Sequence, residues 1–289
     1  MEGVRYEAPE TLQAAVALLV GATGAARILA GGTDVIVQME TDLIEPALLV
    51  DIKKIKETRQ IASENGGFRV GAAVPAMDIA NHAAFCKAWP GVVDGVKLIG
   101  SMQIKGRASM GGNLCNASPA ADAVPALVAA GAIARIIGPS GLREVSVENI
   151  PTGPGKAALA KGEILVSFFL PPRPAHSSDA YQRFTPRTEM DIAVVGVGIN
   201  LTLDDGGICK SARVALGAVA PTVLLVPEAA AALIGTRVDG AALERLAAAA
   251  SAACRPIDDK RGTKEYRVKV AGVLAKRTAQ QALERARKN

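Results

Sequence analysis

The chain has 289 residues, is 49% hydrophobic and carries a formal net charge of +5 at pH 7. This length allows one large or two to three smaller domains with a substantial core. Composition excludes several classes of protein. No apolar run reaches the ~18–20 residues of a membrane span, and the N-terminus lacks the basic and apolar regions of a secretory signal, so we expect a cytoplasmic protein.

The four cysteines, Cys86, Cys115, Cys209 and Cys254, are far apart and show no C-x-x-C spacing. This disfavours a zinc site, an iron–sulfur cluster or a disulfide framework on this chain. The basic excess lies near the C-terminus, and only 3% of the residues are aromatic. With so few rings for base stacking, nucleic-acid binding is not expected.

The N-terminal part of the sequence predicts mixed helix and strand. Apolar residues at helical spacing over 12–19, behind Pro9, indicate an amphipathic helix with the proline in its first turn. Buried strands are predicted over 27–30 and 48–51. Residues 61–72 predict a hairpin around an Asn-Gly-Gly turn.

The middle of the chain continues the mixed pattern. A helix is predicted over 92–99, and a second over 119–130 with Ser118 as its N-cap and a glycine as its C-terminal stop. A hairpin over 132–147 and a strand over 164–170 follow.

A proline-rich segment over 171–178, with three prolines in four residues, is the clearest linker. We therefore expect two domains, over 1–175 and 176–289. The second domain should contain alanine-rich helix after three strands, predicted over 181–184, 193–203 and 208–216.

Two glycine stretches suggest a bound dinucleotide: Leu29-Ala30-Gly31-Gly32-Thr33-Asp34, and the segment from Ala108 to Pro119. Glycine lets the main chain approach an anion closely, and each stretch leads toward a helical pattern. Thr33, Ser109 and Asn113 add short side-chain donors. A hydrogen bond to a charged acceptor contributes roughly 1.5–3 kcal/mol, so several amides could hold a pyrophosphate without a lysine. Either stretch alone fits a tight turn equally well, whereas the pair favours a phosphate site.

The sequence does not match other cofactor-binding or catalytic motifs. Residues 196–198 read Gly-Val-Gly inside a predicted strand, with Leu201 where a dinucleotide fingerprint needs glycine. Residues 153–156 read Gly-Pro-Gly-Lys, but Ala157 follows where a phosphate loop needs Ser or Thr. With two histidines in all, a histidine-based triad or metal site is not expected.

Taken together, three segments closely resemble the FAD-binding medium subunit of the molybdenum hydroxylases, the xanthine dehydrogenase and carbon monoxide dehydrogenase family. Residues 28–35 are similar to the first flavin loop of that family, and residues 107–122 to the second. Residues 255–267 resemble the closing domain of the family. The likeness covers nearly the whole chain, and the second loop is its most specific part.

The resemblance implies an α+β fold. A two-lobed FAD-binding domain of the vanillyl-alcohol oxidase (PCMH) type, with lobes over about 1–55 and 56–175, would be followed by a C-terminal domain with a small antiparallel sheet and helices.

It also implies a set of cofactor-binding residues. Two of these residues have competing interpretations. Asp122 could lie in the first turn of the next helix, where its negative charge suits the helix dipole, and Leu165 could be a buried strand residue. Two depart from the family pattern: Ile99 replaces an aromatic residue of some relatives, and Arg183 a common lysine. The implied set is Leu29, Ala30, Gly31, Gly32, Thr33, Asp34, Val35, Ile99, Ala108, Ser109, Gly111, Gly112, Asn113, Ala121, Asp122, Leu165 and Arg183.

The function implied is electron transfer in a heteromeric complex. Electrons would leave a substrate at a molybdenum cofactor on a large subunit, cross 2Fe–2S clusters on a small subunit, reach FAD here and pass to NAD, oxygen or a quinone. No catalytic side chain and no metal are expected on this chain. Residues 186–191 correspond to a loop that controls acceptor access in some relatives. Two alternatives stay open: a stand-alone FAD-dependent NAD(P)H reductase and a non-catalytic assembly protein of the same fold.

Overall fold

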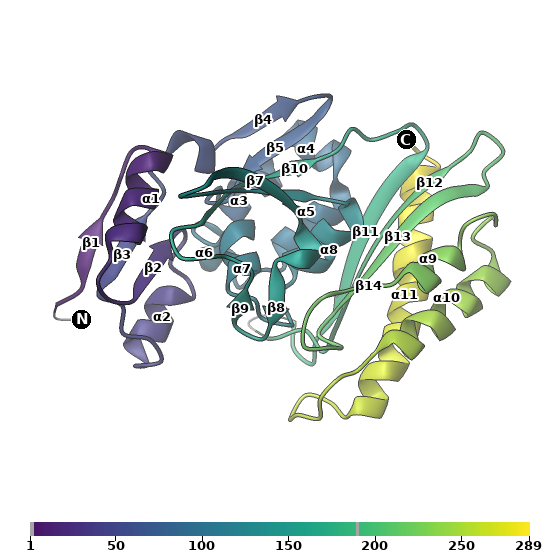
Figure 1. Cartoon of the computed structure of the whole chain (residues 1–289). Helices are drawn as coiled ribbons and strands as arrows, with labels where there is room; N and C mark the ends of the chain where they lie inside the picture. The colour runs from purple at the N-terminus through teal and green to yellow at the C-terminus, as the bar shows by residue number, and fades with distance from the viewer. Residues whose placement is uncertain (1–2, 189–190) are drawn as a thin grey trace.

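The computed structural model describes residues 3–188 and 191–289. The predicted access loop over 186–191 therefore lies partly outside the described residues. The chain forms three successive blocks, each with its own sheet (Figure 1). Their mixture of helices and sheets confirms the predicted α+β class. Within the described ranges, no helix is long and apolar enough to cross a membrane.

The first block is a parallel sheet of three short strands in the order β1-β3-β2. Thr11 caps its first helix by accepting a hydrogen bond from the Ala14 amide. Pro9 lies before that cap, so the prediction of a proline in the first turn is wrong. The elements are β1 (Arg5–Glu7), α1 (Leu12–Gly21), β2 (Ala26–Leu29), α2 (Val35–Glu40) and β3 (Leu48–Asp51).

The second block is an antiparallel sheet in the order β4-β5-β10-β6-β7. Its central strand is the apolar run predicted over 164–170, and both predicted hairpins are confirmed. The strands are β4 (Ile61–Glu64), β5 (Gly67–Gly71), β6 (Ile133–Gly138), β7 (Gly141–Ser146) and β10 (Ile164–Leu170), with a small pair β8 (Pro151–Gly153) and β9 (Lys156–Ala157) beside them.

Six helices interrupt this block between its second and third large strands. They are α3 (Ala76–Asn81), α4 (Ala83–Ala88), α5 (Pro90–Lys97), α6 (Met102–Lys105), α7 (Met110–Cys115) and α8 (Ala123–Ala130). Short 3-10 turns form at Lys56–Thr58 and Val147–Asn149.

The predicted helix over 119–130 is correct only at its end. Gly131, in the left-handed region with φ +70°, stops α8 as expected. The helix begins at Ala123 rather than Pro119, because the Ala123 amide donates to the Asn113 side chain, 3.0 Å away. Ser118 instead closes a turn with the Ala121 amide.

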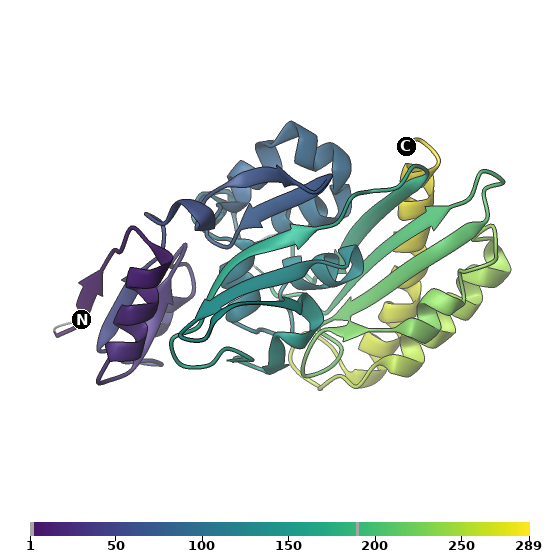
Figure 2. The ribbon, with the colours of Figure 1, turned by 45° about the horizontal axis from the view of Figure 1, so that its top comes forward.

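The third block is a four-stranded antiparallel sheet in the order β11-β12-β13-β14. Helices α10 and α11 cover one face, and α5 and α8 of the second block pack on the other (Figures 1 and 2). The first strand begins at Ser177, four residues earlier than predicted. The elements are β11 (Ser177–Phe184), β12 (Val195–Leu203), β13 (Cys209–Gly217), β14 (Leu224–Leu225), α9 (Pro227–Ala231), α10 (Gly240–Ala253) and α11 (Lys264–Ala286).

Glycine in β12 allows the close approach of α8. A Cβ at Gly198 would lie 2.5 Å from the Pro125 carbonyl oxygen. The third block is therefore packed tightly against α8 of the second block.

Candidate functional site

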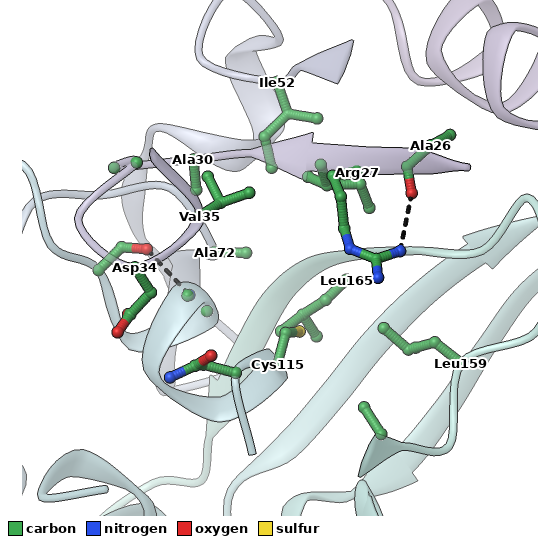
Figure 3. A pocket seen from close by; sticks show the side chains of 18 of the residues that line it. Ala26, Arg27, Ala30, Asp34, Val35, Ile52, Ala72, Cys115, Leu159 and Leu165 are labelled. Atoms are coloured by element: carbon green, nitrogen blue, oxygen red, sulfur yellow. Dashed lines mark hydrogen bonds between the residues drawn. The ribbon is translucent and has the colours of Figure 1, made fainter. Parts of the chain in front are cut away.

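A cavity of about 750 Å³ lies where the first block meets the second. Both glycine stretches line it, the first between β2 and α2 and the second at the start of α7. Figure 3 shows this space with Val35 on the first-block side and Leu165 and Cys115 on the second-block side. The cavity brings together most of the residues that the sequence singled out: Ala30, Gly31, Gly32, Thr33, Asp34, Val35, Ile99, Ala108, Ser109, Gly111, Gly112, Asn113 and Leu165.

The first stretch lines this cavity and has unused backbone donors. The amides from Gly31 to Val35 donate to no atom among the described residues, whereas the next amide, of Ile36, donates to the Gly32 carbonyl. Gly32 makes the bend with φ +81°, a conformation that side chains other than glycine rarely adopt. Five successive free amides at the start of a helix form a site for an anion.

The second stretch differs from the prediction. Its glycines do not precede a helix but form the first turn of α7, with Ser109 as the N-cap. The Gly111 amide donates to the Ala72 carbonyl at 3.1 Å, and the Gly112 amide to Ser109 Oγ at 3.1 Å. The Asn113 amide donates to the Ser109 carbonyl. The amides of Gly111, Gly112 and Asn113 are thus bonded within the protein, and this stretch offers a ligand the Ser109 hydroxyl and the Asn113 side-chain amide.

The missing side chains of the glycines serve two purposes. A Cβ on Gly31 would lie 2.1 Å from the Arg107 carbonyl oxygen, and one on Gly111 would lie 2.4 Å from the Ala72 carbonyl oxygen. These two glycines let segments of the protein approach one another. At Gly112 the nearest atom is Ser109 Oγ, 3.4 Å away, so its Cα faces open cavity.

Polar contacts join the two blocks across the cavity. Gln38 Nε2 donates to Asn116 Oδ1 at 3.0 Å, which links α2 to the end of α7. Lys161 Nζ donates to the Ala22 carbonyl at 3.2 Å. Neither pairing could be predicted from the sequence, because the partners lie 78 and 139 positions apart.

The cavity extends beyond the glycine stretches to a wall that sequence reasoning missed. Arg27, on β2 directly before the first stretch, extends into this space (Figure 3). On the opposite side, residues 159–163 carry no motif and are recognisable only from the fold. Further lining residues of these two regions are Leu19, Ala22, Gly24, Ala26, Gly155, Ala157 and Leu159.

The electrostatics of the wall favour a negatively charged ligand. Arg27 and Lys161 form no ion pair with a carboxylate of the described chain. The charge of Glu163 is balanced by Arg143, with 2.6 Å between Nε and Oε1. Burial raises the pKa of Asp34 above its usual value. Burial also raises the pKa of the Cys115 thiol to about 12, so this sulfur stays neutral.

Four residues of the implied set do not line the cavity: Leu29, Ala121, Asp122 and Arg183. Leu29 belongs to the buried core. Asp122 forms a buried ion pair with Arg183, with 2.5 Å between Oδ2 and Nη1, and accepts a hydrogen bond from the Tyr181 hydroxyl. Burial raises the pKa of Asp122 to about 6 despite the neighbouring guanidinium.

The ion pair lies behind one wall of the cavity. Arg183 Nη1 also donates to the Leu98 carbonyl at 3.1 Å, and Leu98 precedes the lining residue Ile99. The third block thus reaches the site through Arg183. Direct contact of Asp122 or Arg183 with a cofactor stays a prediction. In the described part of the chain, no group of three or more His, Cys, Asp or Glu residues could hold a metal.

Two protein families match the chain in succession. The family described as the FAD binding domain in molybdopterin dehydrogenase matches residues 2–173. The CO dehydrogenase flavoprotein C-terminal domain matches residues 179–282.

Relatives match over nearly the full length. The carbon monoxide dehydrogenase medium chain of Afipia carboxidovorans is 33% identical over 282 residues, 98% of this chain and 97% of that one. A putative xanthine dehydrogenase FAD-binding subunit of Escherichia coli is 30% identical over 280 residues, 96% of this chain and 95% of that one.

The fold is also shared with solved structures. A chain of the Cu,Mo-CO dehydrogenase crystal structure superposes with a TM-score of 0.93 at 33% identity, and 98% of each chain is covered. A chain of quinoline 2-oxidoreductase from Pseudomonas putida 86 gives a TM-score of 0.90 at 27% identity, again with 98% of each chain covered.

Proposed function

The chain belongs to the family of FAD-binding medium subunits of the molybdenum hydroxylases, and we propose that its cavity holds FAD as the flavin centre of such a complex. The subunit accepts electrons from iron–sulfur clusters of a small partner subunit and passes them to an external acceptor. The substrate is oxidised at the molybdenum cofactor of a large partner subunit. When bound, FAD supplies the capacity to exchange electrons singly or in pairs.

The observation that carries this proposal is the run of five free amides from Gly31 to Val35 beside the cavity. A pyrophosphate accepts hydrogen bonds from such amides without displacing any bond of the fold. Each bond to a charged acceptor contributes roughly 1.5–3 kcal/mol. The cavity volume of about 750 Å³ falls within the roughly 300–1,000 Å³ typical of ligand sites.

We assign the roles of the site residues accordingly. The first stretch would hold the pyrophosphate, while the Ser109 hydroxyl and the Asn113 amide would hold neighbouring hydroxyl groups. Ile99 and Leu165 would pack against the ring systems. Ala108, Gly111 and Gly112 would line the site with backbone. The four residues outside the cavity lining, Leu29, Ala121, Asp122 and Arg183, would support its wall from behind.

We also propose the two-domain division over 1–175 and 176–289, with lobes over about 1–55 and 56–175. The two matched families change over between residues 173 and 179, and the third-block sheet begins at Ser177. We place the protein in the cytoplasm, because its four cysteines are free thiols and free thiols persist in reducing compartments.

The test is purification of the tagged chain together with its partner subunits. We expect flavin absorbance, one FAD per chain after extraction, and co-purifying iron and molybdenum. A colourless protein that takes up no added FAD would instead support the assembly-protein alternative. A yellow protein that purifies alone and oxidises NAD(P)H would support the stand-alone reductase.

A further inference from the structure

One part of the cavity is a slot bounded by Arg27 and Leu159. Arg27 lies on β2 of the first block, Leu159 lies between β9 and β10 of the second, and both line the cavity. Figure 3 shows the two side chains extending from opposite sides into the space between them. We propose that this slot binds the adenine ring of FAD, and that Arg27 makes the site prefer FAD to FMN by stacking on that ring. The proposal rests on the proposed function and adds the group that recognises the AMP half of the cofactor.

The surroundings of the slot leave room for a flat ring and have a fixed shape. Arg143 donates to both carboxylate oxygens of Glu163, at 2.6 and 2.7 Å, and to the Ala158 carbonyl at 2.9 Å, so the loop that carries Leu159 is held on the second block. A slot that exists before the ligand arrives costs little conformational freedom on binding. The residues that line the cavity around it are small: Ala22, Gly24, Ala26, Gly155, Ala157, Ala160 and Gly162.

The guanidinium of Arg27 is available to a ligand. The side chain is exposed, and its one hydrogen bond to the described residues runs from Nη1 to the Ala26 carbonyl at 3.2 Å. The carboxylate of Glu163, on the opposite wall, is already paired with Arg143. A guanidinium is planar and more weakly hydrated than an ammonium group, so it stacks on aromatic faces.

The slot lies within reach of the first glycine stretch, the proposed pyrophosphate site. Arg27 precedes Gly31 by four positions, and a strand advances about 3.3 Å per residue, so their Cα atoms are at most about 13 Å apart. The ribose and purine of an AMP group bridge a separation of this order. A dinucleotide with its pyrophosphate at the first stretch can therefore place its adenine against Arg27.

The chemistry of the slot favours adenine over the flavin ring. A cation is attracted to the negative face of an aromatic ring. Adenine carries an electron-donating amino group, whereas the carbonyl groups and imine nitrogens of oxidised flavin withdraw electrons from its ring. Ile99 lines the cavity without adding a charge, and such a side chain suits the flavin ring better than a guanidinium does.

The test uses the complete complex, freed of its flavin and titrated with FAD or FMN while flavin fluorescence is followed. FMN has the same flavin ring but lacks the AMP half. We expect Arg27→Ala to raise the Kd for FAD about 5- to 30-fold, the range of a cation–π contact, and to leave the Kd for FMN unchanged. ADP carries the adenine and a pyrophosphate without a flavin ring, so its Ki as a competitor of FAD should rise by the same factor.

Three further variants isolate the stacking contact. Arg27→Tyr replaces the guanidinium by a neutral ring, which stacks on bases, and should keep the FAD affinity within about threefold of the wild type. Leu159→Ala removes the opposite side of the slot and should weaken FAD but not FMN. The matched control, Arg245→Ala, changes an exposed arginine of α10 that has no carboxylate partner in the part of the chain described, and should bind FAD as the wild type does.

Three results would overturn the proposal. They are an unchanged FAD affinity in Arg27→Ala, an equal weakening of FAD and FMN, which would place the flavin ring in the slot, and a loss in Arg27→Tyr as large as in Arg27→Ala. The last result would mean that the charge of Arg27 acts on a phosphate rather than on a ring. A wild-type complex that takes up neither FAD nor FMN would contradict the proposed function instead, and the effect of Arg27→Ala on ADP binding would still decide the adenine contact.

Discussion

The substitution Gly112→Val separates ligand binding from folding. A Cβ at this position meets only Ser109 Oγ, at 3.4 Å, and the backbone is helical. Replacing a helical glycine recovers about 0.5–1 kcal/mol, which offsets the modest helix preference of valine. We therefore expect the free energy of unfolding of the apoprotein to stay within about 1 kcal/mol of the wild type.

The loss of FAD affinity should be much larger. The two methyl groups of valine would enter the cavity that the first stretch also lines. A pyrophosphate moved away from those amides loses two hydrogen bonds to a charged acceptor, roughly 3–6 kcal/mol. That free energy corresponds to an increase in Kd of about 10²- to 10⁴-fold.

The assay is titration of apoprotein with FAD, followed by quenching of flavin fluorescence, alongside urea unfolding of the same preparation. The control is Gly240→Val at the start of α10, where a Cβ meets nothing within 4 Å. The control should bind FAD as the wild type does. Wild-type affinity in Gly112→Val would refute the site assignment, and an unfolded Gly112→Val protein would refute the distinction between the glycines.

Three further predictions concern the framework of the cavity. Gly31→Ala should lower the free energy of unfolding by about 1–3 kcal/mol, since its Cβ would overlap the Arg107 carbonyl; an unchanged melting temperature would contradict this. The pKa of Asp122, about 6 in the fold against 3.8 ordinarily, means that the folded state binds the proton more tightly. The stability advantage of wild type over Asp122→Asn should thus be greatest below pH 4 and shrink by at most about 3 kcal/mol as pH rises to 6 and above. Urea unfolding of both proteins across that pH range tests this prediction. A stability advantage that grows with pH would show that the charge of Arg183 affects the pKa of Asp122 more than burial does. Asn116→Ala removes the hydrogen bond to Gln38, so the free energy of unfolding should fall by about 0.5–1.5 kcal/mol. FAD should also bind more weakly in the same titration. If neither the free energy of unfolding nor the FAD affinity changed, the hydrogen bond would not act as a bridge between the blocks.

Local signals explain what the sequence could predict of the fold. The Asn-Gly-Gly turn at residues 65–67 gives the hairpin of β4 and β5, and Gly131 ends α8 in the left-handed conformation. Both depend on residues adjacent in sequence. The unbroken apolar run of β10 likewise predicts a strand buried at the centre of a sheet.

Contacts between distant segments explain what could not be predicted. The start of α8 depends on Asn113 of another helix, which takes the role expected of Ser118. In the second glycine stretch, the Gly111 amide donates to the carbonyl of Ala72, the residue after β5. Arg183 comes from the third-block sheet, so its pairing with Asp122 depends on how two blocks pack.

A glycine pair identifies a close approach but not the group that approaches. In this chain Gly31 allows the first stretch to approach Arg107 and Ala108 at the start of the second, and Gly111 allows the second stretch to approach Ala72. The apolar core strengthens the same junction, because residues of the first block pack with Ile164 and Val166 of β10 in one cluster. A cavity held in this way exists before the ligand arrives, so binding free energy is not consumed in closing it. The free amides of the first stretch and the open face of Gly112 can then act on the ligand alone.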